Sequence, residues 1–136
     1  MHWLPEPPPG TPITLGFDGS DTSDWTCIRG ETRDGYAFTP RWNGGPTLWD
    51  PSQHDGRVPR AEVSAAVADL FRRFDVGRMF CDPPGWRTEI EEWAGEHGDE
   101  RVAEFATYRP VAMFDALERF LSDLIEGRVS FDGCPD

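Results

Sequence analysis

The sequence predicts one mixed α/β domain, in which helices pack on a sheet of antiparallel and parallel strands. Its 136 residues are enough for a single domain with one modest core. Apolar residues alternate with small ones in the first part of the chain, and amphipathic stretches then alternate with short apolar runs. Strands joined by a tight turn pair antiparallel, whereas strands separated by a helix pair parallel. We therefore expect a strand meander followed by helix–strand units in a three-layer domain.

The first strands are expected before any helix. Apolar and small residues alternate over residues 13–18, which predicts the first strand. A second strand over 25–29 and a third over 35–40 flank the turn Arg33-Asp34-Gly35, which is a good hairpin signal. A loop rich in Gly, Pro and Trp is expected from residue 42 to about 58.

Helices alternate with short strands in the rest of the chain. Pro59 stands near the start of the first helix, where a missing N–H costs nothing. The apolar run that stops at Asp82 suits a buried parallel strand. In chain order, the expected elements are a helix opening at residue 59, a strand over 76–81, a helix over 86–97, a strand over 102–106 and a helix over 111–126.

The net charge restricts the function. The 13 basic residues are all Arg, and 25 Asp and Glu residues give a formal net charge of −12. Binding to a phosphate backbone depends on clustered cations, so this composition disfavours unassisted binding to nucleic acid. A role on nucleic acid would need a local positive groove, divalent metal ions or basic surface from another part of an assembly.

Cysteine usage and hydropathy indicate a cytoplasmic protein. Cys27, Cys81 and Cys134 are odd in number and widely spaced, which argues against a disulfide framework and a zinc site. No apolar stretch approaches the roughly 18 residues of a membrane span, and the start lacks the features of a secretory signal. The five prolines within residues 1–12 predict an extended linker or a disordered start, with the domain occupying residues 13–136.

Two aspartates stand at the ends of predicted strands. Asp18 follows the first strand, and Asp82 follows the strand over 76–81. If these strands are parallel neighbours, the two carboxylates emerge side by side and repel one another unless a cation lies between them. Mg²⁺ or Mn²⁺ suits such oxygen ligands, and a pair of these ions can support phosphoryl displacement. The alternative is structural, because Asp before Gly or Pro is also common in turns and helix caps.

Three motifs carry a resemblance to a known family. Leu15-Gly16-Phe17-Asp18-Gly19-Ser20, Val58-Pro59-Arg60-Ala61-Glu62-Val63 and Phe80-Cys81-Asp82-Pro83-Pro84-Gly85-Trp86 occur in this order. With the Thr107-Tyr108-Arg109 segment downstream, they make residues 13–136 resemble the C-terminal nuclease domain of phage terminase large subunits. The nearest type is that of actinobacterial phages and prophages.

The resemblance implies an RNase H-like fold and a metal-dependent endonuclease that cuts concatemeric viral DNA during packaging. It implies that Asp18 is the metal ligand of the first strand and Asp82 that of the fourth, with two Mg²⁺ or Mn²⁺ ions in the intact domain. The implied partners are double-stranded viral DNA, a terminase ATPase domain, a small terminase subunit and the portal of the procapsid. No membrane partner is implied, and the location is the cytoplasm of the bacterial host.

The chain departs from that family in two respects. It has no GxxxxGK[ST] loop for an ATPase motor. Family members continue past the segment matching Phe131-Asp132-Gly133 to a third acidic ligand, and neither Asp132 nor Asp136 matches that position. We therefore expect a partial nuclease domain. Two alternatives stay open: a catalytically inactive prophage remnant or assembly module with the same fold, and another RNase H-like nuclease or resolvase.

Other residues are less well supported as functional candidates. Glu89 can assist a metal ion or be a solvated helix residue, and Arg87 and Arg109 can contact phosphate or simply face solvent. Core or loop packing is expected for Trp42, Trp49 and Trp86 rather than stacking on bases, and a buried apolar role for Cys81.

Overall fold

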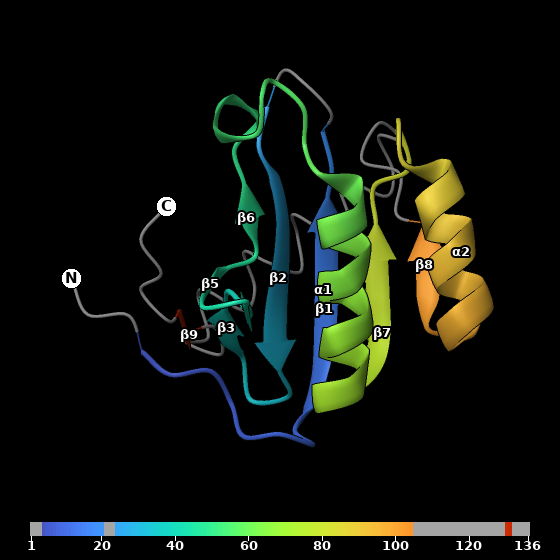
Figure 1. Cartoon of the computed structure of the whole chain (residues 1–136). Helices are drawn as coiled ribbons and strands as arrows, with labels where there is room; N and C mark the ends of the chain where they lie inside the picture. The colour runs from blue at the N-terminus through green and yellow to red at the C-terminus, as the bar shows by residue number, and fades with distance from the viewer. Residues whose placement is uncertain (1–3, 21–23, 105–129, 132–136) are drawn as a thin grey trace.

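One mixed sheet carries the fold. The computed structural model describes residues 4–20, 24–104 and 130–131, and its main sheet has the strand order β8-β7-β1-β2-β3-β9 (Figure 1). Within these residues no helix is long and apolar enough to cross a lipid bilayer. Several sequence predictions fall outside the described residues: the helix over 111–126, the Thr107-Tyr108-Arg109 segment, Cys134, Asp132 and Asp136.

The centre of the sheet is strand β1 (Pro12–Asp18), which pairs with a different kind of neighbour on each side. It is antiparallel to β2 (Thr26–Thr32) and parallel to β7 (Asp75–Cys81). The sheet continues with β3 (Tyr36–Phe38) antiparallel to β2, and with β8 (Val102–Glu104) parallel to β7. The predicted strands are thus confirmed, with ends shifted by a few residues. The order third, second, first, fourth, fifth strand is that of an RNase H-like sheet.

The predicted loop over 42–58 contains short elements that the sequence did not indicate. Strand β6 (Leu48–Trp49) pairs with β2, and β4 (Arg41–Trp42) pairs with β5 (Gly45–Pro46). A 3-10 turn, η1 (Pro51–Gln53), follows, and β9 (Ser130–Phe131) adds a parallel pair beside β3. Two-residue strands have no measurable periodicity, so a pattern of alternation cannot reveal them.

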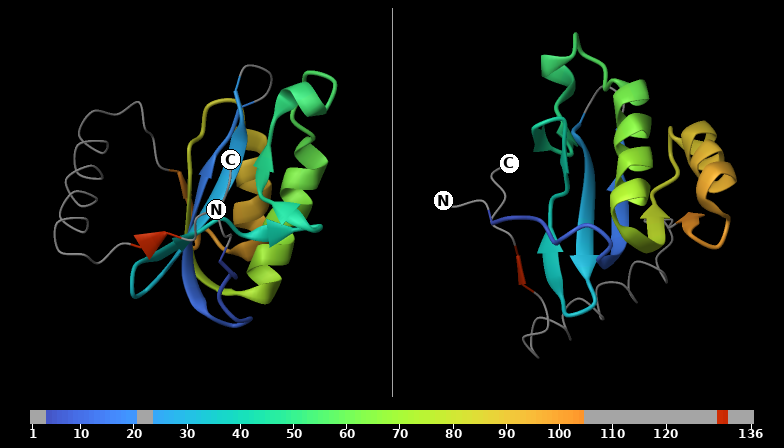
Figure 2. Two further views of the ribbon diagram at one scale, coloured as in Figure 1. Left: turned by 90° about the vertical axis from the view of Figure 1, so that its left-hand side faces the viewer. Right: turned by 60° about the horizontal axis from the view of Figure 1, so that its bottom comes forward.

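Both described helices lie on the same face of the sheet, α1 (Arg60–Arg73) over its middle and α2 (Arg87–His97) toward β8 (Figures 1 and 2). The core lies between these helices and the sheet. Its buried side chains include Leu15 and Phe17 from β1, Val63, Val67 and Leu70 from α1, Met79 and Cys81 from β7, and Ile90 and Trp93 from α2.

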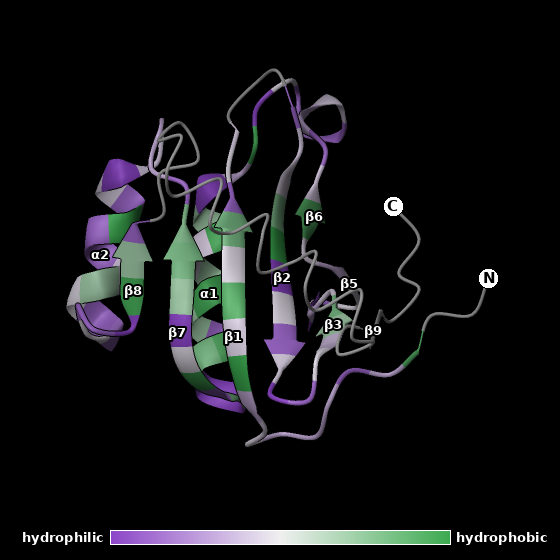
Figure 3. Cartoon of the chain, turned by 180° about the vertical axis from the view of Figure 1, so that it is seen from behind, coloured by the Kyte–Doolittle hydropathy of each residue, from purple (hydrophilic) through white to green (hydrophobic). Residues whose placement is uncertain are grey.

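No described helix covers the other face of the sheet, which Figure 3 shows from behind. Side chains alternate between the two faces of a strand, so Thr14, Gly16 and Asp18 point away from the helices. In β7, which was expected to be buried, Phe80 on this second face is 37% exposed. The three-layer arrangement remains a prediction, since the helix that would test it lies outside the described residues.

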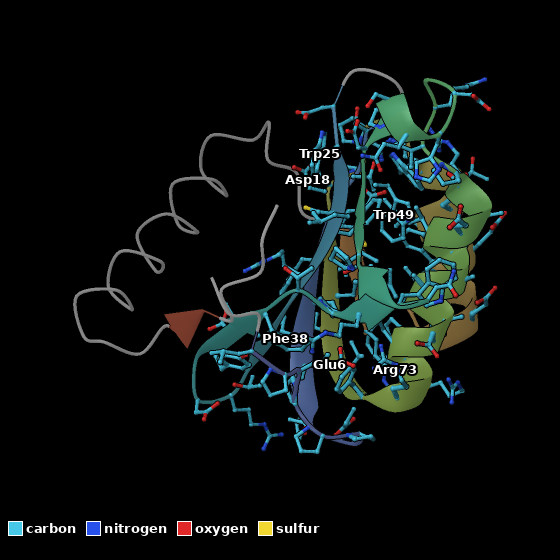
Figure 4. The ribbon with its side chains drawn as sticks, turned by 60° about the vertical axis from the view of Figure 1, so that its left-hand side comes forward. Glu6, Asp18, Trp25, Phe38, Trp49 and Arg73 are labelled. Carbon is cyan, nitrogen blue, oxygen red and sulfur yellow. The ribbon has the colours of Figure 1, made fainter. Side chains whose placement is uncertain are left out.

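Residues 4–11 run along the end of the sheet where β1 begins. The Gly10 N–H donates to the carbonyl of Arg73 at 2.7 Å, and the Glu6 carboxylate forms an ion pair with the Arg73 guanidinium (Figure 4). The Tyr36 hydroxyl donates to the carbonyl of Pro5 at 3.1 Å. These contacts attach the proline-rich segment to α1 and β3 at the opposite end from Asp18.

The contact between Phe71 of α1 and His97 of α2 predicts a pH dependence of stability. The rings stack with their centroids 3.9 Å apart, and Nε2 of His97 is buried without a hydrogen-bond partner among the described residues. Burial lowers the pKa of His97 below its ordinary value. The unfolded chain therefore binds a proton more tightly, and stability should fall as the pH decreases through about 6.5.

Chemical denaturation at pH 7.5 and 5.5 checks this prediction. A His97→Phe variant retains an aromatic partner for Phe71 and should lose less unfolding free energy between these two pH values than the wild type. Equal losses in the two proteins would show that His97 does not contribute.

Candidate functional site

The structure places Asp18 and Asp82 at the same end of two adjacent parallel strands. Phe17 is in register with Cys81, and the N–H of Asp82 donates to the carbonyl of Phe17 at 3.1 Å. The carboxyl ends of parallel strands meet at one edge of a sheet. The strand adjacency on which the sequence argument depended is therefore present, whereas the metal-binding role of the two aspartates stays a prediction.

Both carboxylates line one depression on the face without described helices. Its volume is about 260 Å³, and its walls include Gly16, Asp18, Arg29, Phe80 and Asp82. Figure 4 shows Asp18 at this end of the sheet, with Glu6 and Arg73 at the other. The acidic pair and the attached N-terminal segment thus occupy opposite ends of the domain.

The electrostatics of Asp18 reflect its acidic neighbours. The pKa of Asp18 is raised. The largest cause is the partial burial of its carboxylate, followed by the negative charge of Asp82 and then by that of Asp24. The Oδ1 atom of Asp82 is buried. Two carboxylates held close in partly buried surroundings favour a proton or a cation between them.

These donors fit a hard divalent cation. Carboxylate oxygens and water are the ligands that Mg²⁺ and Mn²⁺ prefer in proteins. Within the described part of the chain, however, no group of three or more His, Cys, Asp and Glu side chains is arranged to hold a metal ion. The pair Asp18 and Asp82 can provide part of a centre, and a two-ion centre would need further ligands.

One aromatic side chain connects the loops that carry the two aspartates. Trp86 is fully buried, and its Nε1–H donates to the carbonyl of Ser20 at 3.2 Å. Its ring packs edge-on against Phe17 with the centroids 5.0 Å apart. Gly19 lies directly against this ring, because a Cβ built there would be 2.5 Å from Nε1 of Trp86.

The other candidate residues are engaged elsewhere. Glu89 forms an ion pair with Arg60 at 3.0 Å, and Arg87 forms one with Glu104 at 3.1 Å. The expected core roles of Trp49 and Trp86 are confirmed, with exposed fractions of 4% and 0%. Cys81 is buried as predicted, and burial raises the pKa of its thiol to about 12, so it stays neutral.

Sequence reasoning missed one residue that lines the depression with the acidic pair. Arg29 lies there and donates to the Thr39 hydroxyl. The signal for Arg29 was available in the hairpin, since pairing it with Gly16 puts it on the Asp18 face. That register depends on a turn of exact length, which the sequence pattern alone does not determine.

Two curated phage proteins are similar to this chain. Each is named Gene 13 protein, one from Mycobacterium phage D29 and one from Mycobacterium phage L5, and they are 34% and 32% identical to it over 137 residues. The matches cover 93% of this chain and 22% of each relative, so the chain spans about a fifth of the length of the curated relatives it matches. No family model matches the chain, and no solved structure matches it significantly. The similarity supports a phage origin and does not specify an activity.

A titration of Asp18 tests the proximity of the acidic pair. Replacing Asp82 by Asn removes a neighbouring negative charge, so the pKa of Asp18 should fall toward its ordinary value. Asp24→Asn should lower it less, because Asp24 makes the smaller contribution. Carbon-detected NMR of the Asp18 carboxyl group measures both effects. An unchanged pKa in Asp82→Asn would show that the carboxylates are not neighbours.

A Cβ at Gly19 should disturb the contact with Trp86. Gly19→Ala places a methyl group within 2.6 Å of Phe17 and Trp86 atoms, so the unfolding free energy should fall by about 1–3 kcal/mol. Gly45→Ala is the matched control, because no atom lies within 4 Å of its added Cβ, and its effect should stay within about 0.5 kcal/mol. Denaturant titration measures both, and equal stabilities would contradict the contact.

Proposed function

We propose that this chain is the metal-dependent endonuclease domain of a phage terminase large subunit, or part of that domain. It would cut concatemeric double-stranded viral DNA during genome packaging. The observation that supports this most is the adjacency of Asp18 and Asp82 at the carboxyl ends of β1 and β7 in a sheet of RNase H-like strand order. The two mycobacteriophage relatives add support from an independent source.

Asp18 and Asp82 would provide part of a divalent-metal centre, which would hold two ions in the intact domain. A bound Mg²⁺ or Mn²⁺ supplies Lewis-acid stabilisation and a water molecule of lowered pKa to a phosphodiester. The two carboxylates would bind the cation, and its charge would offset the repulsion from Asp82 that adds to the effect of burial on the pKa of Asp18. Arg29, held by Thr39, adds positive charge to the same depression.

The negative charge of the chain requires help in binding DNA. With a formal charge of −12, the domain is repelled by a phosphate backbone except where cations are concentrated. In the proposed system, the ATPase domain, the small terminase subunit and the portal of the procapsid would bring viral DNA to this site in the host cytoplasm. Divalent ions at the acidic pair would reverse the local charge.

A second candidate is a catalytically inactive assembly module or prophage remnant with the same fold. It is favoured by the finding that the described residues contain no group of three or more metal-coordinating side chains. Another RNase H-like nuclease or a resolvase would share the two aspartates, but it would act on a different DNA substrate from that of a terminase.

Metal binding by the 136-residue chain tests the proposal. Isothermal titration with Mn²⁺ should show a site whose dissociation constant rises at least tenfold in Asp18→Asn and in Asp82→Asn, because each variant removes one ligand. Asp75→Asn is the matched control, since Asp75 is an exposed carboxylate at the other end of β7. Equal affinities in all four proteins would mean that Mn²⁺ binds only the diffuse negative surface, and would refute the proposed site.

Cleavage separates the nuclease from the inactive module. Supercoiled plasmid should be nicked with Mn²⁺ by the intact protein of which this chain is proposed to be a part, and at least 100-fold more slowly by its Asp18→Asn variant. An intact protein that binds Mn²⁺ at the pair and leaves the plasmid uncut would favour the assembly module over the nuclease.

A further inference from the structure

We propose that Trp86 is a positioning residue, which holds the loops after β1 and β7 so that Asp18 and Asp82 stay at a fixed separation. The expected effect of Trp86 on metal binding rests on the proposed function, whereas its expected effect on the position of the two loops does not. Metal ligands must be held within about half an ångström of a productive geometry, and supporting contacts supply that precision.

Trp86 contacts the end of β1 and the loop after it in three ways. Its indole N–H donates to the carbonyl of Ser20, its ring meets the edge of Phe17, and it lies where a side chain on Gly19 would be. These three residues flank Asp18 on both sides in the sequence. Moving the Asp18 loop away from β7 would therefore break a partly buried hydrogen bond and open an aromatic contact.

Trp86 is also connected closely to Asp82 through the backbone. The backbone N–H of Trp86 donates to the carbonyl of Pro83 at 3.0 Å, which closes a turn immediately after Asp82. The prolines at 83 and 84 limit the backbone angles of this short connection. Only three residues thus separate Asp82 from Trp86, whose indole contacts the loop that follows Asp18.

Arg60, from the first turn of α1, holds the indole in place. Its guanidinium lies 4.2 Å from the centre of the Trp86 ring, and its Nη1 donates to the carbonyl of Gly85 at 2.8 Å and to Glu89 at 3.0 Å. The ring is thereby enclosed between Phe17 and Arg60 with no exposed surface. A cation–π contact and two hydrogen bonds connect the acidic site to the helix layer.

Trp93 provides a matched control within the same core. It is 1% exposed and packs edge-on against Phe17 with the centroids 5.1 Å apart, as Trp86 does. Its Nε1–H donates to the Ser64 hydroxyl of α1 at 3.1 Å, and not to a loop that carries an aspartate. Replacing either Trp by Phe removes one buried indole donor and a similar volume of core.

The test compares Trp86→Phe with Trp93→Phe in the full chain. Both should lower the denaturation midpoint to a similar extent. Titration with Mn²⁺ should show a dissociation constant about tenfold higher in Trp86→Phe and within twofold of the wild type in Trp93→Phe. Equal changes in the two variants would overturn the proposal, since they would reflect a general loss of packing.

Amide hydrogen exchange tests the positioning role without a metal. The N–H of Ser20 donates to the Thr26 hydroxyl at 2.9 Å and that of Asp82 to the Phe17 carbonyl, so both report on the two loops. Both should exchange at least tenfold faster in Trp86→Phe than in Trp93→Phe. A wild type without a specific Mn²⁺ site would refute the proposed function, and the exchange rates would still decide the role of Trp86.

Arg60→Met covers the case in which Trp86→Phe does not fold. Arg60 is partly exposed, so the core stays intact, but the hold on Gly85 and the indole is lost. The amide of Asp82 should exchange about threefold faster, with a smaller change at Ser20. Wild-type exchange at both amides would contradict the proposed connection.

Discussion

The parallel pairing of β1 with β7 is the constraint on which the rest of the structure depends. β1 is central only because it accepts an antiparallel neighbour on one side and a parallel one on the other. Two parallel neighbours require a crossover connection. Helix α1 is part of this connection, and it buries the sheet face on which it lies. The same pairing brings the ends of two distant segments together. The location of the acidic pair is therefore a consequence of topology and not of local sequence.

Much of this architecture could be predicted, because each large element has its own signal. The alternation of β1, the turn before Gly35 and the apolar stripe of α1 identify the strands and helices to within a few residues. β6 escaped prediction because Leu48 and Trp49 are too few to show a period. Its place is determined by tertiary contacts, including the buried Thr47 hydroxyl beside the carbonyls of Ile28 and Pro40.

The site was predictable only in part, for a related reason. Asp18 and Asp82 stand directly after apolar runs, so their positions at strand ends follow from the sequence, and their meeting follows from the strand order. Arg29 and Trp86 join them through hairpin register and loop packing. The sequence predicted a packing role for Trp86, but not the contact of its indole with the loop after β1. In the sequence, Trp86 cannot be distinguished from any other apolar core residue. Only the tertiary structure shows which segments it holds together.

The acidic side chains at the two ends of the sheet have opposite electrostatic surroundings, and this contrast bears on function. At the end where β1 begins, Arg73 is paired with Glu6 and Asp69. Although burial alone would raise the pKa of Asp69, hydrogen bonds from Arg73 and Arg72 hold it below its ordinary value. At the other end, the pKa of Asp18 is raised by burial and by two further carboxylates. A carboxylate that only stabilised a turn would gain from a basic partner, as Asp69 does. Retaining like charges together is unfavourable for the isolated fold, and sites that bind a cation commonly retain such charges.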